Sequence, residues 1–285
     1  MKLARFDHDG TISAGVVVDG GIVDLSRTNC AFRDIEAIIA GGEEALAAVR
    51  AATAGVAPHV PLAHVRLLAP YHPANYLAIG MNYGKHVAEA QRLGVEKPQY
   101  QYWFNKQITC IAGPYDDVDP GVSEALDYEV ELGVVIGREA KNVKAGDALG
   151  YIFGYVVAND FSARDWQRHC PTFTIGKSFD THGPIGPWIV TADEIPDPQA
   201  LDLRCLVNGE VRQQSNTANM LFSVAQQIEY LSTAFTLKPG DLLATGTPEG
   251  VGVAMQPPVF LQEGDVVRCE VEGIGMIENK VAARK

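Results

Sequence analysis

The sequence predicts a β-rich α+β fold, and three observations support that prediction. Residues 126–136 alternate between apolar and polar side chains, which is typical of a β-strand. Residues 152–159 are almost wholly apolar and predict a buried strand. Helical periodicity is confined to a few short stretches, so we expect strands to form most of the core.

The composition describes a chain that can bury a full core. Of its 285 residues, 47% are hydrophobic and 20% are charged, which predicts one large domain or a small domain attached to a larger one. The formal net charge of -12, without a run of Lys and Arg, argues against nucleic acid or an anionic membrane as a partner. Five scattered cysteines without CxxC spacing, and no signal-like or membrane-spanning run, predict a cytoplasmic protein.

The first 70 residues predict a small unit of strands and helices, and residues 71–285 the larger domain. Residues 15–25 form two apolar runs about Asp19-Gly20, which predicts a β-hairpin. Residues 33–52 carry two helical stripes that Gly41-Gly42 interrupts. Four prolines between residues 58 and 73 then mark a connection. We expect this unit to serve packing.

A phosphatase is the rival enzyme class. Residues 6–11 spell the Asp-x-Asp-Gly-Thr signature of the haloacid-dehalogenase-type phosphatases, with Asp7 as the phosphoryl acceptor. That signature requires a buried strand before it and a loop and helix after it. Here Thr11 leads into the hairpin instead, so Asp7–Gly10 is interpreted as a surface turn.

Three acidic residues are placed on strands that should be buried. Glu129 and Glu131 are two apart and point to the same side, and Asp160 ends the apolar run. An unpaired charge is costly to bury, and a divalent cation would remove that cost. Because no His or Cys is close in sequence, an all-oxygen ligand set favours Mg²⁺ or Mn²⁺ over zinc. The alternative is a solvated strand face whose acids pair with Lys or Arg.

A candidate general base precedes these strands. His86 and Glu89 are three apart in a polar stretch that predicts a helix, so they share a face. A histidine oriented by a carboxylate can accept a proton near neutral pH. An ordinary exposed helical pair is the alternative. Gly80 and Gly84 could act as hinges if this helix closes over a site.

Later segments predict scaffold. Ser223 and Gln226 form a capping box for a helix that Pro239-Gly240 would stop. Its core-facing stripe should contain Val224, Ile228, Leu231 and Phe235. The loop at residues 246–250 could offer backbone N–H groups to an anion, although a plain turn is the alternative. Residues 267–272 alternate and should expose one face to water.

The chain resembles the fumarylacetoacetate hydrolase family across residues 71–275. The resemblance implies a mixed β-sandwich roll as the catalytic domain, behind a small N-terminal domain, and a homodimer. The motifs that support it are Gly80-Met81-Asn82-Tyr83 with His86 and Glu89, Phe104-Asn105-Lys106, Asp127-Tyr128-Glu129-Val130-Glu131-Leu132, residues 159–167 (NDFSARDWQ), residues 176–180 (GKSFD), residues 183–188 (GPIGPW) and residues 239–252 (PGDLLATGTPEGVG).

The resemblance implies a role for each candidate site residue. The metal ligands of the family correspond to Glu129, Glu131 and Asp160. Its water-activating pair corresponds to His86 and Glu89, in a lid that orders in relatives when ligand binds, and its substrate-polarising lysine to Lys177. Its polar substrate contacts correspond to Arg164, Gln167 and Thr247.

These roles predict a Mg²⁺-dependent hydrolase that cleaves a carbon–carbon bond in acylpyruvate-type 2-oxo acids, such as fumarylpyruvate or a diketo sugar acid. His86 would activate water, and Lys177 would stabilise the oxyanion. The resemblance leaves other reactions open: decarboxylation of oxaloacetate, which needs no attacking water, and isomerisation or hydration of 2-hydroxy-dienedioic acids in aromatic catabolism. A non-catalytic binding protein is a further alternative.

Overall fold

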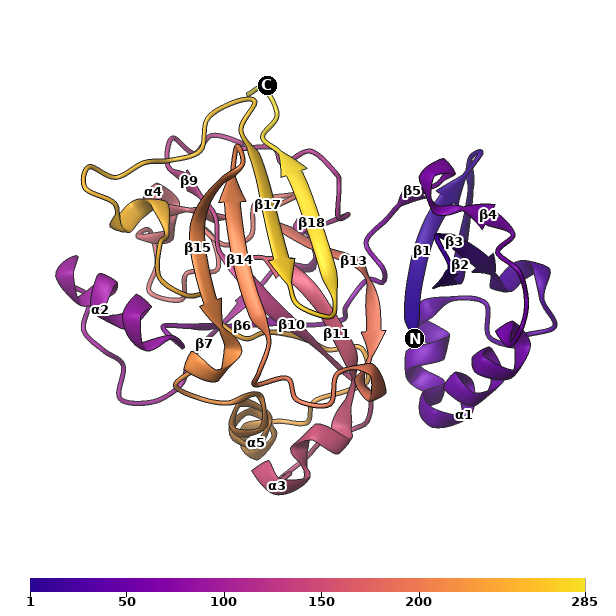
Figure 1. The fold of residues 1–285 in the computed structure, drawn as a ribbon. Coiled ribbons are helices and arrows are strands. Elements are labelled where there is room, and N and C mark those ends of the chain that lie inside the picture. Colours follow the sequence, from indigo (N-terminus) through magenta and orange to yellow (C-terminus); the bar gives the residue numbers. More distant parts are fainter. Residues whose placement is uncertain (285) are drawn as a thin grey trace.

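The fold is β-rich α+β, as predicted, and the computed structural model describes residues 1–284 (Figure 1). Its helices are α1 (Ile35–Thr53), α2 (Gly84–Arg92), α3 (Ala145–Ala148), α4 (Arg164–Gln167) and α5 (Val224–Ala234). Its strands are β1 (Lys2–His8), β2 (Thr11–Val18), β3 (Gly21–Asp24), β4 (Val60–Pro61), β5 (Arg66–Leu67), β6 (Tyr76–Gly80), β7 (Tyr102–Lys106), β8 (Ile111–Ala112), β9 (Leu126–Asp127), β10 (Val130–Ile136), β11 (Ile152–Asn159), β12 (Ser162–Ala163), β13 (Gly183–Thr191), β14 (Asp202–Val207), β15 (Glu210–Asn216), β16 (Leu242–Ala244), β17 (Val266–Val271) and β18 (Gly275–Lys280).

One large sheet forms the centre of the molecule. Its strands follow the order β4-β3-β2-β1-β13-β11-β10-β16-β6-β7, and β5 and β8 pair at its side. β10 and β11 are antiparallel neighbours, with Val130 opposite Asn159. Every residue of both strands is buried, because layers cover the sheet on its two faces. The register brings the start of β10 next to the end of β11, where the candidate metal ligands lie.

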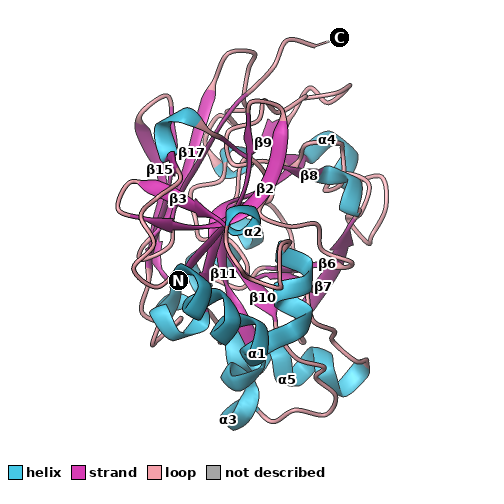
Figure 2. Ribbon diagram, turned by 90° about the vertical axis from the view of Figure 1, so that its right-hand side faces the viewer, coloured by secondary structure: helices cyan, strands magenta, loops and turns pink. Residues whose placement is uncertain are grey.

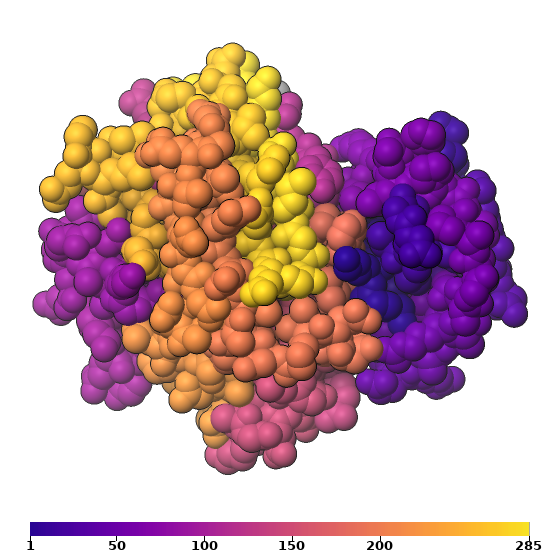
Figure 3. All heavy atoms as spheres, viewed as in Figure 1, coloured from indigo at the N-terminus to yellow at the C-terminus, as the bar shows by residue number. Residues whose placement is uncertain are grey.

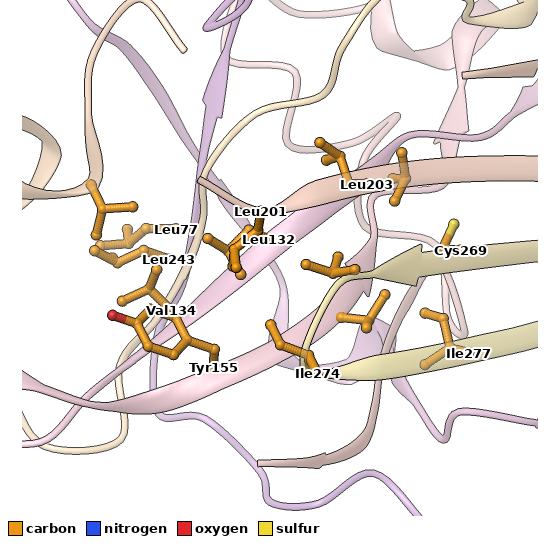
Figure 4. Packing of buried hydrophobic residues seen from close by; sticks show 14 of the residues in the cluster. Leu77, Leu132, Val134, Tyr155, Leu201, Leu203, Leu243, Cys269, Ile274 and Ile277 are labelled. Atoms are coloured by element: carbon orange, nitrogen blue, oxygen red, sulfur yellow. The ribbon is translucent and has the colours of Figure 1, made fainter. Parts of the chain in front are cut away.

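A second sheet, β15-β14-β17-β18, packs on the first and completes a sandwich. Figure 4 shows side chains of both sheets converging in one core, among them Leu132, Leu203 and Ile277. β17 alternates between buried and partly exposed residues, as predicted, because its other face meets water. The helices α3 and α5 lie together at one end of the strands, and α1 belongs to the N-terminal lobe (Figures 1 and 2).

The first 70 residues form a lobe at the side of the sandwich (Figure 3). The predicted hairpin is present as β2 and β3, and the two predicted helices are the halves of α1, kinked at Gly42, where φ is 54°. β1 pairs with β13, so the lobe extends the central sheet. The division of the chain at residue 70 into two domains stays a prediction.

The candidate phosphatase motif lies in this lobe. Asp7 accepts a hydrogen bond from the Gly10 amide at 2.9 Å, in the tight turn between β1 and β2. A strand follows the motif directly, where a phosphatase needs a loop and a helix. Among residues 1–284, no helix combines the length and the apolar character that crossing a membrane requires.

Two details of the predicted elements were wrong. The strand expected across residues 126–136 is broken at Tyr128 and Glu129, between β9 and β10. The capping box of α5 is present, but the helix ends at Ala234. Phe235, predicted to face the core, is instead the C-cap, and it is 44% exposed because its extended backbone turns the side chain outward.

Candidate active site

Three buried carboxylates converge where β10 begins and β11 ends. Glu129 is fixed by two bonds across this break: its amide donates to Asn159 Oδ1 at 2.9 Å, and its carbonyl accepts from the Asp160 amide at 2.9 Å. Glu131 follows two residues later in β10 and lies on the same side. One carboxylate oxygen from each of Glu129, Glu131 and Asp160 lies within 4.8 Å of the others. The predicted trio is therefore assembled.

Cationic side chains surround this trio. Lys177 Nζ lies 2.8 Å from Glu129 Oε2 and 2.7 Å from Asp160 Oδ2. Arg164 Nη2 lies 2.7 Å from Glu129 Oε1. Lys106 donates from Nζ to Asp160 Oδ1 and to the carbonyl of His182. The sequence left open that these acids pair with Lys or Arg on a solvated strand face. The pairing is present for Glu129 and Asp160, but it lies in a buried cluster.

Glu131 differs from its two neighbours in its surroundings. Within residues 1–284 no cationic side chain forms an ion pair with it, and its Oε2 accepts a hydrogen bond from the Gly246 amide at 2.7 Å. Burial and the charges of Asp160 and Glu129 raise the pKa of Glu131 well above its usual range. For Glu129, burial works against ionisation, but the Lys177 and Arg164 cations lower its pKa to about 2.

These residues fit a divalent cation. The donor set is entirely carboxylate oxygen, which suits Mg²⁺ or Mn²⁺. Glu131 forms no ion pair with a cationic side chain of residues 1–284, and its raised pKa means that its ionised form needs further positive charge nearby. A cation of charge two held by Glu129, Glu131 and Asp160 would provide that charge.

The candidate base lies on α2, which starts directly after a strained turn. Met81 adopts a left-handed backbone with φ of 57°, and Asn82 anchors the turn by donating to the carbonyls of Phe222 and Thr245 at 3.0 and 2.8 Å. His86 Nδ1 lies 3.5 Å from Glu89 Oε2. This contact is at the outer limit of hydrogen-bond distance. His86 is close enough to Glu129 to contribute to lowering its pKa.

The loop at residues 246–250 connects the base to the carboxylates. Its Gly246 amide donates to Glu131, and its Gly250 amide donates to both carboxylate oxygens of Glu89 at 3.1 Å. The loop therefore does offer N–H groups to anions, but these anions belong to the protein. Thr247 Oγ1 donates to the Val130 carbonyl at 2.9 Å.

A cavity of about 640 Å³ opens between α2 and the carboxylate centre. Seven of the nine predicted site residues line it: His86, Glu89, Glu129, Arg164, Gln167, Lys177 and Thr247. Glu131 and Asp160 lie deeper, with exposed fractions of 1% and 0%. The structure therefore brings the nine together, while their individual roles stay predictions.

Two buried charged residues of the centre were not singled out from sequence. Lys106 was interpreted as the end of a strand explained by packing, yet it is ion-paired with Asp160. Asp127 accepts hydrogen bonds from Arg164 Nε at 2.9 Å and from the Gly252 and Val253 amides at 2.8 and 3.0 Å. A lysine at the end of an aromatic strand, and an aspartate before a buried strand, were the available signals.

Comparison with known proteins assigns the chain to a family. Residues 75–282 match the family model "Fumarylacetoacetate (FAA) hydrolase C-terminal", and residues 1–70 match "Rv2993c-like, N-terminal". The chain is 44% identical to the mitochondrial oxaloacetate tautomerase Fahd2a of Rattus norvegicus, over 99% of this chain and 91% of the relative.

Solved structures agree with this assignment. The fumarylacetoacetate hydrolase of Exiguobacterium antarcticum is similar with a TM-score of 0.84 and 37% identity, over the full length of both chains. Maleylpyruvate hydrolase of Sphingobium sp. SYK-6, solved with manganese (II) and pyruvate, has a TM-score of 0.82 and 31% identity, also over both full chains. The protein is therefore a member of the fumarylacetoacetate hydrolase family of enzymes.

Proposed function

We propose that this enzyme moves a proton at carbon 3 of a short 2-oxo acid of the oxaloacetate type, interconverting its keto and enol forms. The observation that carries the proposal is the arrangement of the cavity. Three carboxylates that fit a divalent cation lie together beside Lys177, and a histidine paired with a carboxylate lines the same cavity. The 44% identity to a protein named oxaloacetate tautomerase supports this substrate class.

The cation, Mg²⁺ or Mn²⁺, would be held by Glu129, Glu131 and Asp160. When bound, it would supply Lewis acidity that makes the protons at carbon 3 more acidic. The manganese named with maleylpyruvate hydrolase supports a divalent ion for that relative, and we extend it to this chain.

The side chains would divide the remaining work. His86 takes the proton from carbon 3 and delivers it to the oxygen of carbon 2, which gives the enol, and the reverse transfer restores the keto form. Glu89 orients the imidazole ring through Nδ1. The Gly250 amide in turn fixes Glu89. Lys177 is buried and keeps its proton, because burial is outweighed by Asp160 and Glu129, which raise its pKa. It therefore provides a fixed positive charge beside the substrate oxygens.

The test is the decay of enol absorbance after oxaloacetate enol is mixed with the Mg²⁺-loaded protein. We expect His86→Ala to slow this decay by about 100-fold or more, the range of a lost general base. Glu89→Gln should slow it less, because histidine remains. Full activity of His86→Ala would contradict the assignment of the base.

Carbon–carbon cleavage of acylpyruvates is the second candidate. The cavity of about 640 Å³ is larger than a four-carbon acid requires, which favours a longer substrate. In that reaction His86 would activate water, whereas decarboxylation of oxaloacetate needs no such step. His86→Ala should therefore abolish acylpyruvate hydrolysis and largely spare decarboxylation. Equal loss of both would contradict this division.

Three wider predictions accompany the function. We propose a homodimer in the cytoplasm, with neither nucleic acid nor membrane as a partner. Sedimentation showing a monomer at micromolar concentration would refute the dimer. A thermal shift with Mg²⁺ but no turnover of any oxo acid would favour the non-catalytic alternative instead.

A further inference from the structure

The cationic side chains that line the cavity differ in how far they are already engaged. Arg164 uses all three of its nitrogens on protein groups: Nε on Asp127, Nη2 on Glu129 and Nη1 on Gln167 Oε1 at 3.1 Å. Lys177 bridges Glu129 and Asp160. Arg168 also lines the cavity, but it is exposed and forms no ion pair with any acid of residues 1–284. It is the guanidinium that remains available to a ligand.

The charge of the buried centre limits what it can bind alone. The centre contains four carboxylates and three cations: Asp127, Glu129, Glu131 and Asp160 with Lys106, Arg164 and Lys177. When all are ionised, one negative charge remains, and a divalent cation changes this to one positive charge. A single substrate carboxylate then neutralises the centre. A second carboxylate on the same substrate adds one more negative charge, which a further cation of the cavity lining can pair.

The position of Arg168 suits that second carboxylate. Arg168 is the C-cap of α4 and retains helical backbone angles, four residues after Arg164. Side chains four apart on a helix are neighbours, with Cβ atoms about 6 Å apart. Arg164 contacts the carboxylate centre, and Arg168 follows it by about one helical turn at an exposed position of the cavity lining. A long guanidinium side chain at that spacing can meet the second carboxylate of a short diacid whose other end lies at the centre.

The rest of the cavity lining, as far as residues 1–284 show, offers Arg168 no acid that lacks a partner. Much of it is apolar and includes Leu93, Val95, Val251, Val253 and Ala254. The two acids of the lining are already engaged: Glu89 with the Gly250 amide and His86, and Glu129 with Arg164 and Lys177. The Arg168 guanidinium can therefore bind a carboxylate delivered by the ligand, with two parallel hydrogen bonds.

We infer that Arg168 is a specificity-determining residue that binds the distal carboxylate of a short 2-oxo dicarboxylic acid. The inference rests on the proposed function, in which the 2-oxo end of the substrate lies at the carboxylate centre. It adds that the enzyme selects diacids over monoacids of equal length, and that one exposed arginine makes this selection.

The experiment compares binding of two four-carbon acids that differ only at the distal end. Freshly dissolved oxaloacetate and 2-oxobutanoate are titrated calorimetrically into the full-length protein with saturating Mg²⁺. We expect the wild type to bind oxaloacetate at least about tenfold more tightly. Arg168→Met should weaken the affinity for oxaloacetate by about 10- to 100-fold, which is the range for a charged hydrogen-bonded pair. The affinity for 2-oxobutanoate should stay within about threefold of the wild-type value. Arg168→Lys should recover part of the loss.

A matched control removes an arginine elsewhere. Arg33 is exposed on the N-terminal lobe and does not line the cavity, so Arg33→Met tests the effect of net charge alone. Equal binding of the two acids by the wild type, or equal weakening of both by Arg168→Met, would overturn the inference and leave the proposed function standing. If the wild type binds neither acid, the proposed function fails and the inference fails with it.

Discussion

Two acidic regions of this chain contain similar residues in opposite surroundings. In the turn between β1 and β2 the Asp9 side chain is 89% exposed, and in the buried carboxylate centre the Asp160 side chain is 1% exposed. The exposed acid needs no partner, because water solvates it. The buried acid has two lysines as partners, Lys106 and Lys177. The comparison teaches that a short acidic motif indicates chemistry only when the fold buries it.

The largest effect should follow from removing one cation of the buried centre. Lys106→Met removes one of the two lysines that balance the charge of the buried Asp160 carboxylate. This should lower the free energy of unfolding by about 3–5 kcal/mol. The measurement is urea unfolding in EDTA. Added Mg²⁺ should restore part of the loss. As a matched control, Lys85→Met removes a lysine that is 83% exposed and should change stability by less than about 0.5 kcal/mol.

The next effect concerns the acid that lacks a protein cation. Glu131→Gln should weaken Mg²⁺ binding on the order of 100-fold, removing about 2.7 kcal/mol of metal-induced stabilisation at a fixed metal concentration. In EDTA the variant should be at least as stable as the wild type. Glutamine keeps an acceptor for the Gly246 amide and carries no charge. Calorimetry and thermal unfolding measure both quantities, with the exposed Glu210→Gln as control. Unchanged Mg²⁺ affinity would contradict the ligand assignment.

A smaller effect should appear as a pH dependence of stability. Burial and the nearby Lys106 lower the pKa of His182 to about 3, and its Nε2 donates to the Asp119 carbonyl at 2.9 Å. The unfolded chain binds a proton near pH 6.5, so the unfolded state holds more protons between these values. The free energy of unfolding therefore does not depend on His182 above pH 6.5. Below that pH it falls, by about 2 kcal/mol at pH 5.

Replacing His182 should flatten that dependence. His182→Gln keeps a donor and does not titrate, so its stability should change less between pH 7 and pH 5 than that of the wild type. The exposed His64 provides the matched control, because His64→Gln should keep the wild-type slope. An unchanged slope in His182→Gln would show that another group is responsible.

The smallest effect belongs to the exposed acids. Asp9→Asn should change the free energy of unfolding by less than about 0.5 kcal/mol and leave enol turnover unchanged, since Asp9 lies in a solvated turn. Thermal unfolding and the oxaloacetate assay provide the readings. Loss of a phosphatase activity in Asp7→Asn would instead revive the rival enzyme class.

The sequence alone predicted those parts of the site whose positions follow from a local periodic pattern. Glu129 and Glu131 could be placed on one side from a two-residue period, and Asp160 from the end of an apolar run. Lys177 could not be placed in this way, because it lies in a loop without periodicity, and only the family resemblance identified it. Lys106 was missed because its partner is 54 residues away, and pairing between distant strands leaves no local pattern.

The same reasoning explains the errors in the fold. The break at Tyr128–Glu129 depends on Asn159 of a neighbouring strand, which bonds the Glu129 amide. The outward position of Phe235 depends on where α5 ends, and apolar spacing alone does not determine a helix end to one residue. The first error arises where a tertiary contact overrides the local sequence, and the second where local spacing leaves the end of a helix undetermined.

The loop at residues 246–250 has a practical consequence for protein engineering. Gly250 has φ of 101°, and a Cβ there would lie 2.0 Å from the Arg212 carbonyl oxygen; at Gly246, with φ of 98°, it would lie 2.6 Å from Asn82 Cβ. Libraries aimed at new acids can vary the exposed apolar residues of the cavity lining, Leu93 and Val95. Randomising this loop would displace Glu131 and Glu89 together, because the Gly246 and Gly250 amides hold them. A screen for activity would discard such a clone without showing whether the proposed metal site or the proposed base had been lost.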